Sequence, residues 1–253
     1  MKAFLRKEWM ENLRTGRLLI LGIIFFIFGL MNPAIAKLTP WLMENMKDSI
    51  TDTGIEFGEV TISAMTSWTQ FYKNTPMCVI VIVLMLGGIF VNEYQKGTLV
   101  QVVTKGLSRR KIFFSKMVNV YGLWTLMYLV YFGVTYGYTV YFWPEDKVES
   151  ILFGAFCYWL FGMILLAFLL LFSAIADNVG QVLLGVGAVV AAMFFLNYVP
   201  KLQKYLLLRL TEGLNLSLGS LDAEDFVPAV IISCISVVIC SIMGMALFDK
   251  RDL

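Results

Sequence analysis

Apolar and polar positions follow one another along the chain in long blocks, and six of these blocks are uncharged runs. The runs are Leu18–Ala36, Asn74–Asn92, Met117–Pro144, Ser150–Ala176, Asn178–Pro200 and Phe226–Phe248. About 20 apolar residues allow a helix to cross hydrocarbon, and the runs lack the period-two alternation of barrel strands. The pattern predicts an all-α membrane protein whose six transmembrane helices cover about residues 18–36, 75–92, 117–143, 150–176, 179–199 and 226–248.

Charged residues are distributed unequally between the two sides of this predicted bundle. The N-terminus, the second and fourth connections and the C-terminus hold thirteen of the 20 Lys and Arg residues but six of the 18 acidic residues. Basic residues accumulate on the cytoplasmic side of a membrane. We therefore expect both termini in the cytoplasm and external loops at residues 37–74 and 200–225.

The segment before the first run, residues 1–17, has an amphipathic helical pattern. Phe4, Leu5, Trp9 and Leu13 share one face, as in helices that lie in the headgroup region. An N-terminal interfacial helix and a basic flank that merely orients the first span explain these residues equally well. Neither a linker nor a repeat divides the chain, so we expect one transmembrane domain over residues 1–253.

The composition excludes several function classes. Hydrophobic residues make up 59% of the chain and charged residues 15%, and the net charge of +2 gives no indication of nucleic-acid binding. Histidine is absent, which removes His-dependent catalysis and His-ligated metal sites, and the four cysteines lie inside the runs. The chain also lacks a phosphate-binding loop and a charged residue in mid-span. We expect no catalytic residue, metal or cofactor in this chain, so a partner must supply energy for any transport.

A short segment after the second run carries a recognisable motif. Glu93 is followed by Gly97-Thr98, then by Ser108-Arg109, and Lys116 stands at the start of the third run. The arrangement resembles the type-2 family of ATP-binding-cassette (ABC) exporter permeases, in which a glutamate and a Gly-Thr pair open a cytosolic coupling helix. The resemblance implies coupling roles for Glu93, Gly97, Thr98, Ser108, Arg109 and Arg110. A basic loop that only sets the topology is the simpler alternative.

The same resemblance implies partners and a location. It implies a permease, most simply a homodimer, in a bacterial plasma membrane, bound to two cytosolic ATPase subunits that carry ATP and Mg. The large external loop and the aromatic face of the third run favour an amphipathic peptide of the antimicrobial or cytolytic kind as the cargo. A drug or lipid exporter and a non-transporting sensor or scaffold remain alternatives, whereas an intramembrane enzyme lacks the paired catalytic groups that it would need.

Two further patterns lie inside the runs. Tyr128, Tyr131, Thr135 and Tyr138 share one face of the third run and are candidates for the wall of a translocation path, although helix packing is the favoured explanation. Gly185, Ala188 and Ala192 form a face of small side chains on the fifth run. Small residues allow close backbone approach, so this face suits a dimer contact or an intrachain contact.

Overall fold

The computed structural model describes residues 2–50, 63–104, 106–146 and 148–251, and within these ranges it contains helices and no strand. Six helices are long and apolar enough to cross a membrane. The long helices are α2 (Arg17–Ile50), α3 (Ala64–Leu86), α6 (Arg109–Phe142), α7 (Ile151–Ile175), α8 (Val179–Leu196) and α10 (Val227–Lys250). The short ones are α1 (Lys2–Arg14), α4 (Val91–Gln95), α5 (Thr98–Thr104) and α9 (Gly213–Ser217). The predicted all-α class with six candidate spans is confirmed.

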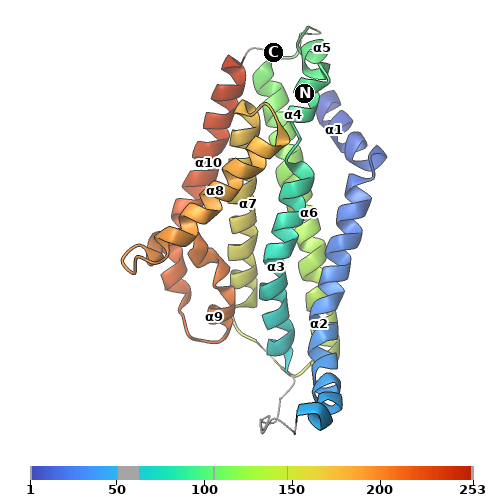
Figure 1. Cartoon of the computed structure of the whole chain (residues 1–253), viewed down its shortest axis with the longest axis vertical. Coiled ribbons are helices and arrows are strands. Elements are labelled where there is room, and N and C mark those ends of the chain that lie inside the picture. The colour runs from blue at the N-terminus through green and yellow to red at the C-terminus, as the bar shows by residue number, and fades with distance from the viewer. Residues whose placement is uncertain (1, 51–62, 105, 147, 252–253) are drawn as a thin grey trace.

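Both chain termini lie at the same end of the bundle, together with α1, α4 and α5 (Figure 1). We call this the terminal end, and the opposite end, which includes the beginning of α3, the distal end. Helix α6 occupies a central position, since it packs against α1, α2, α3, α7 and α10. A movement of α6 would therefore shift its contacts with most of the bundle.

The boundaries of the first three predicted spans differ from those of the helices. Residues 37–74 are helical at both ends, because α2 continues to Ile50 and α3 begins at Ala64; residues 51–62 lie outside the described ranges. A lysine ends an uncharged run without ending a helix, so both helices extend into the range predicted as an external loop. Lys73 is exposed while Trp68 and Phe71, on the same helix, are buried.

Two more boundaries differ. Helix α3 ends at Leu86 rather than 92, at an uncharged turn over residues 87–90. Helix α6 begins at Arg109 rather than 117 and so extends through several basic residues. The last three predicted spans agree with α7, α8 and α10 to within three residues.

The connection from α8 to α10 folds back against the bundle. It contains the 3-10 turns Gln203–Tyr205, Leu207–Thr211 and Ala223–Phe226 in addition to α9. Leu207, Leu208 and Leu210 are buried, and the turn that carries them contacts α7 and α10. This leucine-rich stretch thus belongs to the packed part of the distal half.

Candidate functional site

The motif around Glu93 lies in two short helices at the terminal end. Gly97 separates α4 from α5 and has a φ of +64°, a left-handed conformation that glycine adopts without steric cost. Thr98 begins α5, and its hydroxyl donates to the carbonyl oxygen of Glu93 at 3.4 Å. Any other residue would be strained in this left-handed turn between α4 and α5. Helix α5 lies between the second and third spans, where the coupling helix was expected.

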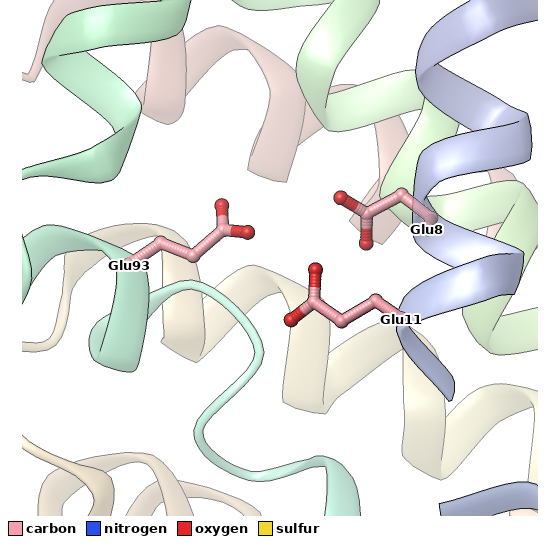
Figure 2. Close-up of side chains that lie close together, drawn as sticks. All are labelled: Glu8, Glu11 and Glu93. Carbon is pink, nitrogen blue, oxygen red and sulfur yellow. The ribbon is translucent and has the colours of Figure 1, made fainter. Parts of the chain in front are cut away.

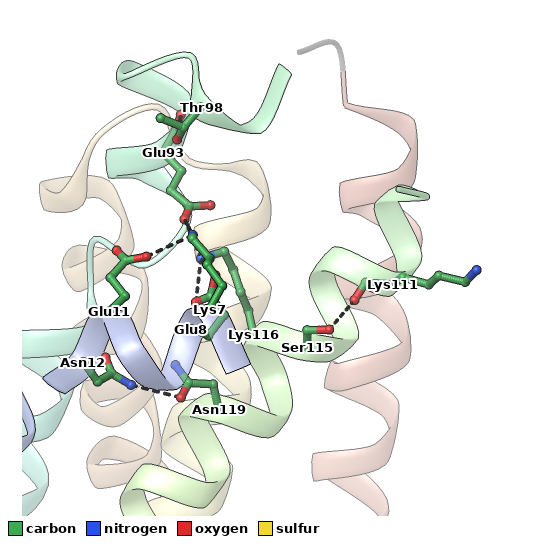
Figure 3. Close-up of polar contacts among 10 residues, drawn as sticks. All are labelled: Lys7, Glu8, Glu11, Asn12, Glu93, Thr98, Lys111, Ser115, Lys116 and Asn119. Atoms are coloured by element: carbon green, nitrogen blue, oxygen red, sulfur yellow. Dashed lines mark hydrogen bonds and ion pairs between the residues drawn. The ribbon is translucent and has the colours of Figure 1, made fainter. Parts of the chain in front are cut away.

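The carboxylate of Glu93 points away from α5 towards a lysine on α6 (Figure 3). The Nζ of Lys116 lies 3.0 Å from Oε1 of Glu93 and 3.2 Å from Oε2 of Glu8 on α1. Lys116 is only 1% exposed. Burial of an ammonium group is costly unless its charge is paired, so the two carboxylates together allow this lysine to lie inside the bundle.

A second lysine closes the network. The Nζ of Lys7 lies 3.1 Å from Glu8, 2.9 Å from Glu11 and 3.1 Å from Glu93. The three carboxylates approach one another from α1 and α4 (Figure 2). We call Lys7, Glu8, Glu11, Glu93 and Lys116 the charge cluster, in which two positive charges meet three negative ones.

Proton affinities on α1 reflect this network. Burial alone would lower the pKa of Lys7, but its hydrogen bond to Glu11 and the charges of Glu8 and Glu93 raise that pKa well above 10.5. Burial would likewise raise the pKa of Glu11, but the hydrogen bond from Lys7 and the nearby positive charges lower it below 4.5. Both groups are therefore held in their charged forms at neutral pH.

Three neighbouring carboxylates also raise the question of a metal ion. One oxygen atom from each of Glu8, Glu11 and Glu93 lies within 4.8 Å of the others. Each of these carboxylates is already bound to an ammonium group of Lys7 or Lys116. In this conformation the geometry is that of an ion network.

A neutral pair extends the contact between α1 and α6. The amide of Asn12 donates to Oδ1 of Asn119 at 3.0 Å, and both side chains are buried. Glu8 and Asn12 thus form the face of α1 that is buried against the bundle, while Leu13 is exposed. Phe4 and Trp9, on the predicted apolar face of α1, are only partly buried. The buried polar face was not predicted, because the i, i+4 spacing of Glu8 and Asn12 shows only that the two residues share a face.

The two predicted coupling arginines contact the chain's own C-terminal segment. Arg109 donates to the backbone carbonyls of Asp249, at 3.1 Å, and of Arg251. Arg110 pairs with the Asp249 carboxylate at 2.8 Å. Arg251 in turn bonds Asp177, in the turn between α7 and α8, at 2.6 Å. We call these five residues the C-terminal clasp.

Ser108 stands where the motif places it, at the N-terminal end of α6. Its backbone is extended there, φ −66° and ψ 143°, and its carbonyl accepts the first backbone bonds of the helix. Its hydroxyl makes no capping bond. Ser108 therefore marks the start of the helix without stabilising it as a side-chain cap.

Three of the four candidate path residues are buried between helices. The hydroxyls of Tyr128 and Tyr131 donate to the carbonyls of Ala155 and Phe71, at 2.7 and 2.8 Å. Thr135 donates to the Gly29 carbonyl at 3.0 Å. These bonds satisfy the hydroxyls inside the chain, as helix packing requires. Tyr138 differs, because it is exposed and lines a groove beside Phe142.

The small face of α8 divides into two parts. A Cβ on Gly185 would lie 2.8 Å from the ring of Phe172 on α7, so Gly185 serves an intrachain contact. Ala188 and Ala192 are exposed and remain available to lipid or to another chain.

A comparison with known protein families gives one match. A family model described as "ABC-2 family transporter protein" matches residues 3–253. No curated protein matches the chain. The matched range includes every residue of the charge cluster and of the C-terminal clasp.

Proposed function

Since the chain belongs to the ABC-2 family of transporter proteins, we propose that it is the membrane permease subunit of an ATP-driven exporter. Members of this family generally work with a cytosolic ATPase. In this proposal the ATPase binds α5 at the terminal end, and ATP and Mg belong to that partner. The permease itself carries no catalytic residue.

One observation carries the proposal: the buried Lys116 is held by α1 and α4 at the same time. Glu93 on α4 lies five positions before the start of α5, and Lys116 lies within the second turn of α6. A force on α5 therefore reaches the central helix directly through the Glu93–Lys116 contact at 3.0 Å. It also reaches it indirectly through α1, because Lys7 pairs with Glu93 and Glu8 pairs with Lys116. A buried ion pair resists separation because each charge would be left unpaired in a low dielectric.

The exposed face of α5 is suited to a docking partner. Thr98, Gln101 and Thr104 recur every three residues and are exposed, while Leu99 between them is buried. Arg110 and Lys111 are exposed at the adjacent start of α6. The concentration of basic residues at this end supports its proposed location in the cytoplasm.

The proposed assembly contains two permease copies and two ATPase subunits. Ala188 and Ala192 on the exposed side of α8 are the proposed contact between copies, because small side chains allow helices to approach closely. Membrane lipid covers the remaining apolar faces.

The proposed cargo is an amphipathic peptide of the antimicrobial or cytolytic kind, with a drug or a lipid as the alternative. Tyr138 and the aromatic residues at the distal end provide amphipathic surface for such a molecule. A non-transporting sensor or scaffold would have no need of an ATPase or of an intact charge cluster, which makes the two explanations experimentally separable.

The test is reconstitution of the permease and its copurified ATPase in proteoliposomes, with Glu93→Gln as the variant. We expect the variant to bind the ATPase and hydrolyse ATP while its export of a fluorescent amphipathic peptide falls on the order of tenfold, since one of two ionic contacts to Lys116 is lost. Glu224→Gln, the same substitution at an exposed glutamate of the distal connection, is the control. Unchanged export by Glu93→Gln would refute coupling through the cluster, and the absence of any ATPase from native preparations would favour the sensor or scaffold.

A further inference from the structure

A hollow of about 640 Å³ opens at the distal end, where α3 and α7 begin and α6 ends. Its wall includes three aromatic side chains, Trp68, Tyr136 and Trp143, and the carboxylate of Asp146. Trp68 is fully buried and lies 6.3 Å from Tyr136, measured between ring centroids. The volume falls within the range of small-molecule sites, about 300–1,000 Å³.

The chemistry of this wall favours a positive charge. The faces of Trp and Tyr rings attract ammonium and guanidinium groups, and a carboxylate beside them adds a full negative charge. One oxygen of Asp146 accepts the backbone N–H of Ala64 at 3.1 Å, which fixes the carboxylate at the rim of the hollow.

A second hollow of about 530 Å³ adjoins the first. The two share Val148 and Ser150, and the second adds the carboxylates of Glu149 and Asp222. Ser150 has a φ of +57°, a left-handed turn that lies between the two hollows. Two adjacent hollows that both carry negatively charged carboxylates suit a ligand with more than one positive charge.

The three carboxylates have no basic partner among the described residues. The ion pairs in that part of the chain include none with Asp146, Glu149 or Asp222. Lys147, outside the described ranges, is the one basic residue between positions 145 and 150. The wall therefore retains negative charge beside its aromatic rings.

We propose that these adjoining hollows bind the cationic side chains of an amphipathic peptide, with one Lys or Arg beside Asp146 and the aromatic rings and a second beside Glu149 and Asp222. The peptide's apolar face lies along the exposed aromatic side of α6. This assignment names the cargo class of the exporter and rests on the proposed function for its physiological meaning, although binding itself needs no ATPase.

The experiment measures peptide binding to the purified chain without any ATPase. The chain is placed in nanodiscs of phosphatidylcholine, which carry no net charge. The probe is a fluorescent amphipathic helix made of Leu and Lys, and its counterpart has Gln in place of Lys. We expect the Lys peptide to bind and the Gln peptide to bind on the order of tenfold more weakly, as lost charge pairing with a partly exposed site implies.

The variants separate the aromatic contribution from the carboxylate contribution. Asp146→Asn/Glu149→Gln/Asp222→Asn should weaken binding by about tenfold, and Trp143→Leu by about threefold, the loss of an exposed cation–π contact. Asn at 146 retains an oxygen to accept the Ala64 N–H. Glu224 is an exposed acid at the same end that lines neither hollow, so Glu224→Gln is the control for the loss of a single negative charge outside the site.

Each outcome has a definite meaning. Equal binding by the triple variant, or equal weakening by Glu224→Gln, would overturn the site. Thermal unfolding of every variant excludes misfolding, and Trp143→Leu tests the site without any change in charge. Binding that follows the predicted order in a chain that never copurifies with an ATPase would retain the site and refute the exporter, whereas peptide export unaffected by the triple variant would refute this site alone.

Discussion

The first turns of α6 are held on one side by the charge cluster and on the other by the C-terminal clasp, and the two regions differ in burial. Within the cluster the side chains of Lys116 and Glu8 are 2% and 4% exposed. Within the clasp those of Arg110 and Asp249 are 72% and 32% exposed. Both regions join α6 to another helix by ion pairs of about the same length, so the two regions differ in the burial of these pairs and not in their distances.

Burial changes what an ion pair does. In water, an exposed pair gains little, because solvent screens it and two flexible side chains must be ordered. In the interior, each charge depends on its partner, so loss of one leaves the other unpaired at high cost. The cluster is thus suited to transmit force from α4 to α6, and the clasp to position the C-terminal segment more loosely.

The largest expected effect comes from Lys116→Met. The change leaves the buried Glu8 carboxylate dependent on Lys7 alone and should destabilise the fold by about 3–5 kcal/mol. Thermal unfolding in detergent measures the loss. Lys111→Met is the matched control on the same helix, because Lys111 is exposed and points away from the cluster (Figure 3). A similar loss in both variants would contradict the role of burial.

A smaller effect is expected from Asn12→Ala, which breaks the neutral pair beside the cluster. Asn119 would retain its buried amide without this partner, at a cost of about 1–3 kcal/mol. The double variant Asn12→Leu/Asn119→Leu should recover part of the loss, since both polar groups are then removed. If the double variant were less stable than the single one, the two asparagines would stabilise the fold by more than the hydrogen bond that they make to each other.

Arg110→Ala should change stability by about 0–1 kcal/mol, because its pair with Asp249 is largely exposed. The effect should shrink further in high salt. Unfolding measured at low and high ionic strength tests this, with Lys116→Met as the salt-insensitive comparison. A loss as large as that of Lys116→Met would show that the clasp, and not the cluster, holds α6.

The smallest effect concerns pH. The pKa of Glu11 is lowered in the folded chain below its ordinary 4.5, so its contribution is present above that pH and is lost as the pH falls through the folded pKa. The raised pKa of Lys7 gives a contribution that is complete below its ordinary 10.5 and is lost only at still higher pH. Glu11→Gln should therefore lose less stability than the unchanged chain when the pH falls below 4.5. Between pH 6 and 10 the free energy of unfolding should depend on pH in the same way in both chains. A different pH dependence of the free energy of unfolding near pH 7 would contradict the assignment of Lys7 and Glu11 as charged groups.

Much of the fold was predictable from local pattern. Apolar runs identified the six candidate spans, because the length and the hydrophobicity of a run are local properties of the sequence. The continuation of α2 through Lys37 and of α3 through Lys73, and the start of α6 at Arg109, were not predictable from charge alone. A lysine or arginine can continue a helix and direct its charged group outwards.

The sequence by itself determined the class of the molecule: hydrocarbon demands long helices with internally satisfied backbones, and this demand acts on each segment separately. Only the tertiary structure decided which polar residues meet. Glu8, Glu93 and Lys116 are separated by 85 and 23 positions, and no local pattern states that α1 docks with its polar face inwards. The tertiary structure also shows that Arg109, which was expected to take part in coupling, bonds the chain's own C-terminal segment. The physical reason is that pairing between distant charges depends on the three-dimensional packing that brings them within a few ångströms and removes the water between them.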